Sequence, residues 1–303
     1  MKKYTLLKLF PIVLILLLGK SSLGATKTST QSGNWSSSAT WGGSAAPVAG
    51  DDVILDGGFT VTVDVPNAVC SSMQIGGSVL GAGTGTLTLT SGTRLTVSGI
   101  VNIGPINSNS TAGSLNMTNG GTLTCDGIFV GRLGTWSEGT GTIELTATNT
   151  IPTDNKVIFN NLTLSGGTTT LPGNLDVKGN ILINTSATLN GGANTLSVSG
   201  EWTNNGTFTG NTGTVTFLKN GNQTISGTGL NNFNLIRVNL GTSINNTLEV
   251  KSSHFNAPDG FLTIINGTFK MSGIFPFAST FVAGPIYNID PGTGLWINNP
   301  NVT

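Results

Sequence analysis

A 28-residue repeat is the feature of this sequence that most constrains its fold. Glycine or apolar residues recur at this step in six sets: Gly85, Gly113 and Gly141; Leu87, Leu115 and Ile143; Leu89, Met117 and Leu145; Leu95 and Leu123; Val69, Val97 and Cys125; Met73, Val101 and Phe129. Apolar residues at one spacing stack when each turn of chain lies on the turn before it. The repeat therefore predicts an all-β, single-stranded parallel β-helix, or β-solenoid. Crossover chirality favours the right-handed form.

A shorter step appears further along the chain. Leu175, Leu196 and Phe217 recur at a 21-residue step, and Val177 and Ile181 have counterparts at the same step. Shorter corner loops would produce this change within one continuous solenoid. The sequence thus predicts a signal peptide over residues 1–24, an N-terminal cap over 25–50, 28-residue rungs over 51–150 and roughly 21-residue rungs over 151–303. We expect the C-terminus to be truncated between rungs, with further solenoid domains following it.

The N-terminus has the pattern of a secretory signal. Basic Lys2, Lys3 and Lys8 precede an apolar run over residues 9–18, and the small residues of Ser22-Leu23-Gly24 follow it. This arrangement predicts cleavage near Gly24 and a secreted or cell-surface protein. The apolar run is shorter than the roughly 20 residues of a membrane span, and no other stretch is long and apolar enough. The alternative is an N-terminal anchor that is retained.

The charge of the mature chain argues against a nucleic-acid partner. The signal carries four of the 13 basic residues and none of the 13 acidic ones, so the mature chain has 9 basic against 13 acidic residues and is four charges negative. No basic patch is present, as nucleic-acid binding would need. The 44 glycines and the abundant Thr and Asn favour strands and turns over helices.

Two cysteines in a secreted chain suggest a disulfide, but the repeat argues against one. Cys125 shares its column with Val97 and Val69, whereas Cys70 is one residue further along. The two cysteines are also two rungs apart, about 9–10 Å at the usual strand spacing, which exceeds the reach of a disulfide. We expect two free thiols, with Cys125 pointing inward.

Two groups of aromatic residues each have two interpretations. Trp35 and Trp41 precede the first strong strand, so they are candidates for a cap over the first rung, or for a ligand-stacking pair on the surface. Six phenylalanines crowd the C-terminal part: Phe255, Phe261, Phe269, Phe275, Phe277 and Phe281. They indicate a bulkier core near the end of the stack, or an aromatic platform for carbohydrate.

The acidic residues Asp51, Asp52, Asp56 and Asp64 are the candidate metal ligands, and calcium is the ion they suit, because it prefers several hard oxygen ligands. Their spacing matches neither an EF-hand loop nor the nonapeptide of calcium-binding β-rolls. The alternative is a turn, formed by Asp51 and Asp52, that precedes a strand. No other cofactor is predicted.

No catalytic residue is predicted. The single histidine, His254, has no carboxylate near it in the sequence, and one histidine with two separated cysteines is a poor zinc set. A polysaccharide lyase or hydrolase would need carboxylates in one groove, and the acids do not share one column. A groove formed from Asp176, Glu201, Glu249 and Arg237 on separate rungs stays open.

Regular Thr-x-Thr columns would indicate an ice-binding face. Thr86 and Thr88 begin such a pattern, but the 28-residue step aligns them with Ser114 and Asn116, which breaks the columns. The repeat block therefore does not favour ice binding.

A family resemblance rests on the segments Asn34-Trp35-Ser36 through Trp41, Pro47 to Leu55 and Val61-Thr62-Val63-Asp64. They look like the opening of a G8-like domain, similar to the N-termini of large secreted surface proteins of the Bacteroidota. Later segments beginning at Asn174, Thr195 and Gly229 resemble the repeats that follow in such proteins. The resemblance implies an all-β, Gly-rich extracellular chain associated with polysaccharide or surface interaction. No catalytic residue carries over, and the sorting domain for type IX secretion, frequent in this group, is absent from this sequence.

These observations predict a secreted or cell-surface, adhesin-like structural protein that presents a Thr- and Asn-rich face to a glycan or matrix. One alternative is a carbohydrate-active β-helix enzyme, either a polysaccharide lyase or a hydrolase. The other is a passive structural spacer. The ligand and the oligomeric state are not fixed by the sequence.

Overall fold

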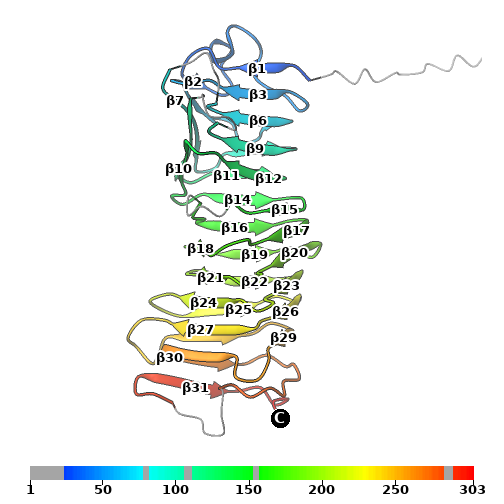
Figure 1. The fold of residues 1–303 in the computed structure, drawn as a ribbon, viewed down its shortest axis with the longest axis vertical. Coiled ribbons are helices and arrows are strands. Elements are labelled where there is room, and N and C mark those ends of the chain that lie inside the picture. The colour runs from blue at the N-terminus through cyan, green and yellow to red at the C-terminus, as the bar shows by residue number, and fades with distance from the viewer. Residues whose placement is uncertain (1–23, 78–81, 106–110, 153–156, 283–288) are drawn as a thin grey trace, which may run out of the picture.

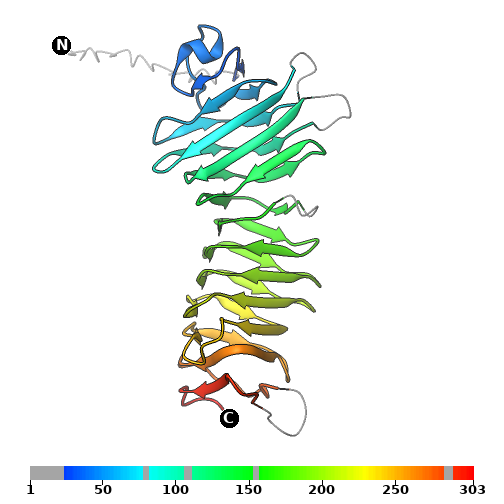
Figure 2. The same ribbon diagram turned by 90° about the vertical axis from the view of Figure 1, so that its left-hand side faces the viewer.

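A computed structural model describes residues 24–77, 82–105, 111–152, 157–282 and 289–303. The predicted signal peptide lies outside these residues except for Gly24. The described chain is an elongated stack of parallel strands, with its N-terminal part at one end of the long axis and its C-terminus at the other (Figures 1 and 2). The only helix in these ranges is a short 3-10 turn, η1 (Ser38–Trp41). The prediction of an all-β parallel solenoid is confirmed.

Three sheets build the N-terminal part of the stack, and the labels A, B and C are used for them below. Sheet A contains β1 (Thr26–Thr28), β3 (Asp52–Leu55), β6 (Ser72–Ile75), β9 (Ile100–Ile103) and β12 (Gly127–Val130). Sheet B contains β2 (Gly33–Asn34), β4 (Thr60–Thr62), β7 (Thr84–Thr90), β10 (Ala112–Asn119) and β13 (Gly134–Ser137). Sheet C begins here with β5 (Ala68–Cys70), β8 (Arg94–Val97) and β11 (Thr122–Cys125).

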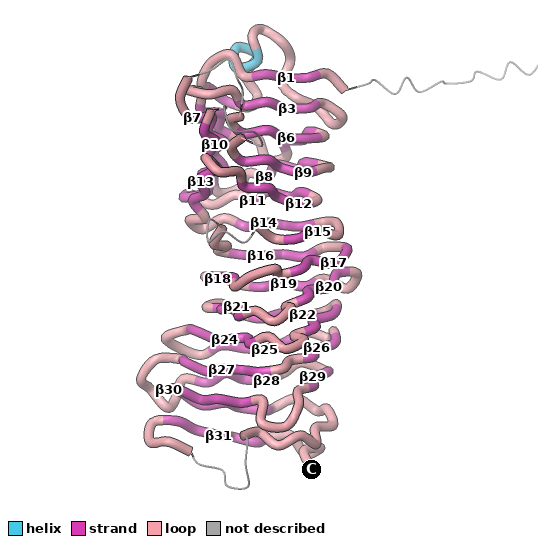
Figure 3. Tube along the Cα trace, in the orientation of Figure 1, coloured by secondary structure: helices cyan, strands magenta, loops and turns pink. Residues whose placement is uncertain are grey.

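Sheet C continues through the C-terminal part, where sheets D and E replace A and B. Its later strands are β14 (Thr142–Leu145), β16 (Asn161–Leu164), β19 (Ile181–Ile183), β22 (Trp202–Asn204), β25 (Gln223–Ser226), β28 (Thr247–Val250), β30 (Leu262–Met271) and β31 (Thr293–Ile297). Sheet D contains β15 (Asn149–Thr150), β17 (Gly167–Thr170), β20 (Ala187–Asn190), β23 (Thr207–Thr209), β26 (Leu230–Asn232) and β29 (His254–Asn256). Sheet E contains β18 (Leu175–Val177), β21 (Thr195–Val198), β24 (Thr214–Leu218) and β27 (Leu235–Asn239), and β30 belongs to both E and C. The strands run across the long axis at successive levels of the stack (Figure 3).

Alternation along the strands separates the core from the outer faces. In β14 the burial pattern alternates between half-exposed and buried positions, as it does in β16, β21 and β24. This is the signature of strands with one buried face. Leu87 pairs with Leu115 and Leu95 with Leu123, so the inner columns of the 28-residue repeat form as predicted over these rungs.

The predicted third repeat of the 28-residue step, at Gly141, Ile143 and Leu145, is wrong. Ile143 pairs with Leu123, and not with Leu115, whose next neighbour is Trp136. In the later block Phe217 pairs with Val198, so the 21-residue step also does not hold throughout. Corner loops change length from rung to rung, and a fixed step then slips out of register.

The cysteine columns were also predicted one residue out of register. Cys70, not Val69, pairs with Val97, which places Cys70 in the same inner column as Cys125. Both thiols are free and buried. Burial raises the pKa of each thiol to about 12, so both act as small apolar residues of the core.

Aromatic side chains fill both ends of the core. The rings of Trp35 and Trp41 are buried and meet edge to face at 5.3 Å, and Trp41 Nε1 donates a hydrogen bond to the Trp35 carbonyl. Because both rings are inside the first turn, the alternative of a surface stacking pair is wrong. The six C-terminal phenylalanines are also buried and pack on one another, which confirms the bulkier core.

Candidate functional site

The outer face of sheet C carries one continuous column of polar side chains that ends at a tryptophan, and we call it the polar column. Its members, in order along the stack, are Arg94, Thr122, Thr142, Asn161, Asn180, Glu201, Thr224, Glu249, Lys270 and Trp296. Each residue sits on the rung after its predecessor because the strands of sheet C are parallel and stay in register. The column therefore follows the long axis of the molecule.

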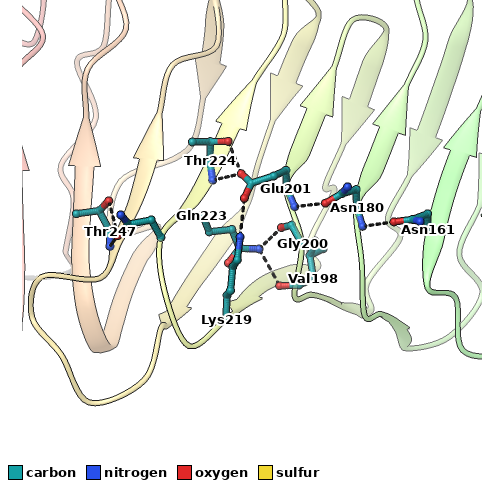
Figure 4. Close-up of polar contacts among 10 residues, drawn as sticks. Asn161, Asn180, Val198, Gly200, Glu201, Lys219, Gln223, Thr224 and Thr247 are labelled. Atoms are coloured by element: carbon teal, nitrogen blue, oxygen red, sulfur yellow. Dashed lines mark hydrogen bonds and ion pairs between the residues drawn. The ribbon is translucent and has the colours of Figure 1, made fainter. Parts of the chain in front are cut away.

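Side chains in the middle of the polar column are bonded to the backbone of the next rung (Figure 4). Asn161 Oδ1 accepts the N–H of Asn180 at 2.9 Å, and Asn180 Oδ1 accepts the N–H of Glu201 at 2.8 Å. Glu201 Oε2 then accepts the N–H of Thr224 at 2.7 Å. These bonds satisfy the backbone at the start of each strand, and they hold the side chains in fixed positions.

Two hollows lie along the polar column and meet at Thr142. The first, of about 500 Å³, is lined by Arg94, Thr122 and Thr142 together with the turns at Ser91-Gly92 and Gly120-Gly121. The second, of about 310 Å³, is lined by Thr142, Asn161, Thr163, Asn180, Ile181, Leu182, Glu201 and Thr203. Together they form a groove that spans successive rungs of sheet C, with hydroxyl and amide groups on its walls.

Arg94, which lines the first hollow, forms an ion pair with Glu144. Arg94 Nη1 contacts Glu144 Oε2 at 2.6 Å, and the hydroxyl of Thr124 donates to the same carboxylate oxygen at 3.1 Å. Partial burial acts to raise the pKa of Glu144, but the hydrogen bonds from Ser165, Arg94 and Thr124 outweigh it and lower the pKa. Glu144 is therefore held as a carboxylate.

The two glutamates of the polar column are also held as carboxylates. Glu201 binds Lys219 at 2.7 Å and accepts hydrogen bonds from Thr224. Glu249 binds Lys251 and Lys270, both at 2.9 Å. In both cases desolvation acts to raise the pKa, and the hydrogen bonds from these partners outweigh it. The pKa of Glu201 is lowered, and that of Glu249 falls to about 2.

The sequence left open a groove formed from four residues on separate rungs, and the structure does not bring these residues together. Glu201 and Glu249 lie in the polar column, separated by Thr224. Asp176 and Arg237 lie instead on the outer face of sheet E, in a column that also contains Ser197 and Thr216. Across the described ranges, no ion pair or hydrogen bond joins any two of the four.

The four candidate calcium ligands each have a separate role. Asp51 is buried and accepts the N–H groups of Ala25 and Val48, at 2.8 and 3.1 Å. Asp52 accepts the hydroxyl of Ser72, and Asp56 accepts the N–H of Gly57.

Asp64 accepts both the N–H and the hydroxyl of Ser36. These bonds lower its pKa although desolvation acts to raise it. Among the residues that the structure describes, no group of three or more His, Cys, Asp or Glu side chains is placed to share a metal ion. The turn interpretation fits Asp51, whose side chain fixes the backbone ahead of β3.

Sequence reasoning missed the polar column because its members are unevenly spaced. The step along the chain is 20 from Thr122 to Thr142, 19 from Thr142 to Asn161, and 25 from Thr224 to Glu249. A local signal was available for some members: Arg94, Thr122, Thr142, Asn161, Asn180 and Glu201 each stand at or just before the start of a short apolar alternation.

The described residues include no helix with the length and apolar character needed to cross a bilayer. Comparison of the chain with protein-family models, with curated proteins and with solved structures finds no match.

Proposed function

We propose that this chain is a secreted or cell-surface, adhesin-like structural protein that binds a glycan or matrix polymer along the polar column of sheet C. The observation that carries the proposal is the groove itself. Two hollows of about 500 and 310 Å³ meet at Thr142 and follow the long axis. A groove of this direction suits an extended chain better than a compact ligand.

The chemistry of the groove walls suits a hydroxyl-rich polymer. Thr122, Thr142 and Thr163 supply hydroxyl groups, and Leu182 supplies an apolar surface for the less polar side of a sugar ring. One sugar of an extended glycan is about as long as the distance between neighbouring strands, about 4.8 Å. Successive sugars would therefore meet equivalent positions on successive rungs, and weak contacts would add up through multivalency.

The sequence supports a location outside the cell. The basic start, apolar run and small residues of the first 24 positions have the pattern of a secretory signal. The G8-like resemblance of the segments around Trp35 and Asp51 implies the same location and an association with polysaccharide.

Electrostatics favour binding over cleavage along the polar column. Glu201 and Glu249 are two rungs apart, about 9–10 Å at the usual strand spacing, which is near the separation of the two carboxyl groups in an inverting glycosidase. One of such a pair must act as a general acid with a raised pKa. Both glutamates have lowered pKa values and lysine partners, so neither is suited to donate a proton.

A pair of matched variants tests this proposal. Thr142→Trp fills the point where the two hollows meet, and Thr216→Trp places the same side chain on the outer face of sheet E. Both proteins and the wild type are tested on a soluble glycan array and on insoluble polysaccharides, with a reducing-sugar assay in parallel. We expect the wild type and Thr216→Trp to bind without releasing sugar, and Thr142→Trp to lose binding.

Each other outcome contradicts the proposal in its own way. Release of reducing sugar by the wild type would support the enzyme alternative. An absence of binding in both assays would support the passive spacer. Equal binding by both variants would place the glycan on another face.

A further inference from the structure

The outer face of sheet D carries a regular array of threonines, which we call the threonine array. Its members form four rows of two: Thr148 and Thr150; Thr168 and Thr170; Thr188 and Asn190; Thr207 and Thr209. Seven of these eight positions are threonine. The two members of a row are separated by one inward-facing residue.

The rows are in register. Thr150 pairs with Thr170, Thr168 with Thr188 and Thr188 with Thr207, and no shift interrupts the pairings from β15 to β23. Neighbouring rows are therefore one strand spacing apart, about 4.8 Å, and the two columns are two residues apart along the strand, about 6.6 Å. The result is a two-dimensional lattice of hydroxyl and methyl groups.

Six of the seven threonine hydroxyls have no hydrogen-bond partner among the described residues. Within the described part of the chain, none of the seven threonine hydroxyls donates a hydrogen bond to another protein atom, and only Thr148 Oγ1 accepts one, from the N–H of Thr168 at 3.1 Å. The array also contains no charged residue. It therefore offers hydrogen-bonding groups without the tightly held hydration shell that a charged side chain carries.

The lattice is rigid because of what lies beneath it. Between the two columns, Thr169, Leu189 and Phe208 point inward and are buried, and Phe208 packs edge to face on Trp202 at 4.8 Å. Threonine is β-branched, so its χ1 angle is restricted. A surface that is already ordered loses little conformational entropy when it binds.

We propose that the threonine array binds crystalline water, that is, the surface of ice. Ice is a lattice of water oxygens with repeats of a few ångströms, and a flat, uncharged and regular array of hydroxyl and methyl groups can hold water molecules in matching positions. A crystalline polysaccharide is the other regular surface rich in hydroxyl groups. The array favours ice over it because its eight positions include no aromatic side chain to stack on a sugar ring.

The array was hidden from the sequence because its rows do not follow the 28-residue step. The step is 20 from Thr148 to Thr168, 20 from Thr168 to Thr188, and 19 from Thr188 to Thr207. The columns that argued against ice binding, beginning at Thr86 and Thr88, belong to sheet B. There Asn116 pairs with Thr88, so those columns are indeed mixed.

Adsorption of the full chain to ice tests the proposal. Thermal hysteresis and the shape of a single ice crystal are measured for the wild type, for Thr188→Lys in the middle of the array, and for Thr216→Lys on sheet E. Circular dichroism and thermal unfolding establish that each variant is folded. We expect the wild type and Thr216→Lys to shape ice and lower its growth temperature, and Thr188→Lys to lose both effects.

Three results would overturn the proposal. The wild type does not adsorb to ice; Thr216→Lys loses activity to the same extent as Thr188→Lys; or Thr188→Lys leaves ice adsorption intact and instead abolishes binding to microcrystalline cellulose or chitin. Thr142→Trp separates this proposal from the proposed function, because it should remove glycan binding in the groove and leave ice adsorption unchanged.

Discussion

Sheets C and D are both built from parallel strands in register, but the outer face of sheet C carries charged side chains and the threonine array on sheet D carries none. The outer face of sheet C is charged, and its charged groups are paired: Arg94 with Glu144, Lys219 with Glu201, and Lys270 with Glu249. The threonine array on sheet D is uncharged, and its hydroxyl groups donate to no protein atom in the described ranges. A parallel solenoid thus sets the spacing of surface groups, while the residue types set what each face can bind.

The comparison also distinguishes polar groups that are bonded within the protein from polar groups that are free to bind a ligand. Amide oxygens in the polar column hold the backbone of the next rung, as Asn161 and Asn180 do, so removing them affects both binding and the fold. A hydroxyl of the threonine array contributes little to the fold and is free for a ligand. Some variants should therefore destabilise the core shared by both faces. Others should affect one face alone, or should change only the surface groups of one face.

The largest expected effect is on the core shared by both faces. Trp202 is buried and contacts Phe208, Phe217 and Phe233. Truncation of such a side chain leaves a cavity, so we expect Trp202→Ala to lower the free energy of unfolding by about 3–5 kcal/mol. Urea unfolding measures this change. Thr203→Ala, on the outer face of the same strand, is the control and should stay close to the wild type.

The next effect concerns the corner that joins sheets C and D. Asn231 Oδ1 accepts hydrogen bonds from Trp202 Nε1 at 2.9 Å and from Asn204 Nδ2 at 3.1 Å, and all three residues are fully buried. Asn231→Leu leaves donors without partners, so we expect a loss of about 1–3 kcal/mol in the free energy of unfolding. Asn232→Leu, on the outer face, is the control. Equal unfolding curves for the two variants would contradict the role given to Asn231.

A smaller effect distinguishes the faces by pH. The pKa of Glu249 is about 2 in the folded chain against an ordinary value of 4.5, so its stabilising contribution is complete above about pH 4.5 and is lost as the pH falls toward 2. We expect Glu249→Gln to flatten the fall in stability over this window. Thr188→Val should keep the wild-type pH dependence, because the threonine array has no carboxylate. Chemical unfolding at a series of pH values measures both.

The smallest effect on stability is expected for Thr188→Val itself. Valine keeps the β-branched shape and removes a hydroxyl that no protein group uses, so the free energy of unfolding should change by less than about 0.5 kcal/mol. The melting temperature, measured by calorimetry, should match the wild type within a few degrees. A large drop would mean that the hydroxyl has a structural role, and would weaken the contrast between the two faces.

The sequence predicts the architecture better than it predicts the faces. Leu87 with Leu115 and Leu95 with Leu123 are inner pairs, and inner residues repeat because they must fill a common core. Outer residues are under no such constraint, so the residue type changes along a column, as from Thr122 and Thr142 to Asn161.

A slip of one residue is enough to turn a side chain from the core to the surface. Phe129 is predicted to stack on Val101, but Val101 pairs with Ile128, and Phe129 is 45% exposed. The polar column and the threonine array both depend on corner loops whose lengths the sequence does not reveal. The polar column and the threonine array could be found only from the strand pairings that the structure shows.

The ladder from Asn161 to Thr224 has a mechanical consequence. Both the backbone hydrogen bonds between rungs and the side-chain bonds of this ladder run along the long axis. Tension applied to the two ends therefore acts directly along these bonds, and the rungs would separate one after another. A force applied across the long axis is instead shared by many rungs. A chain anchored at one end and attached along its side would resist drag far better than a chain stretched end to end.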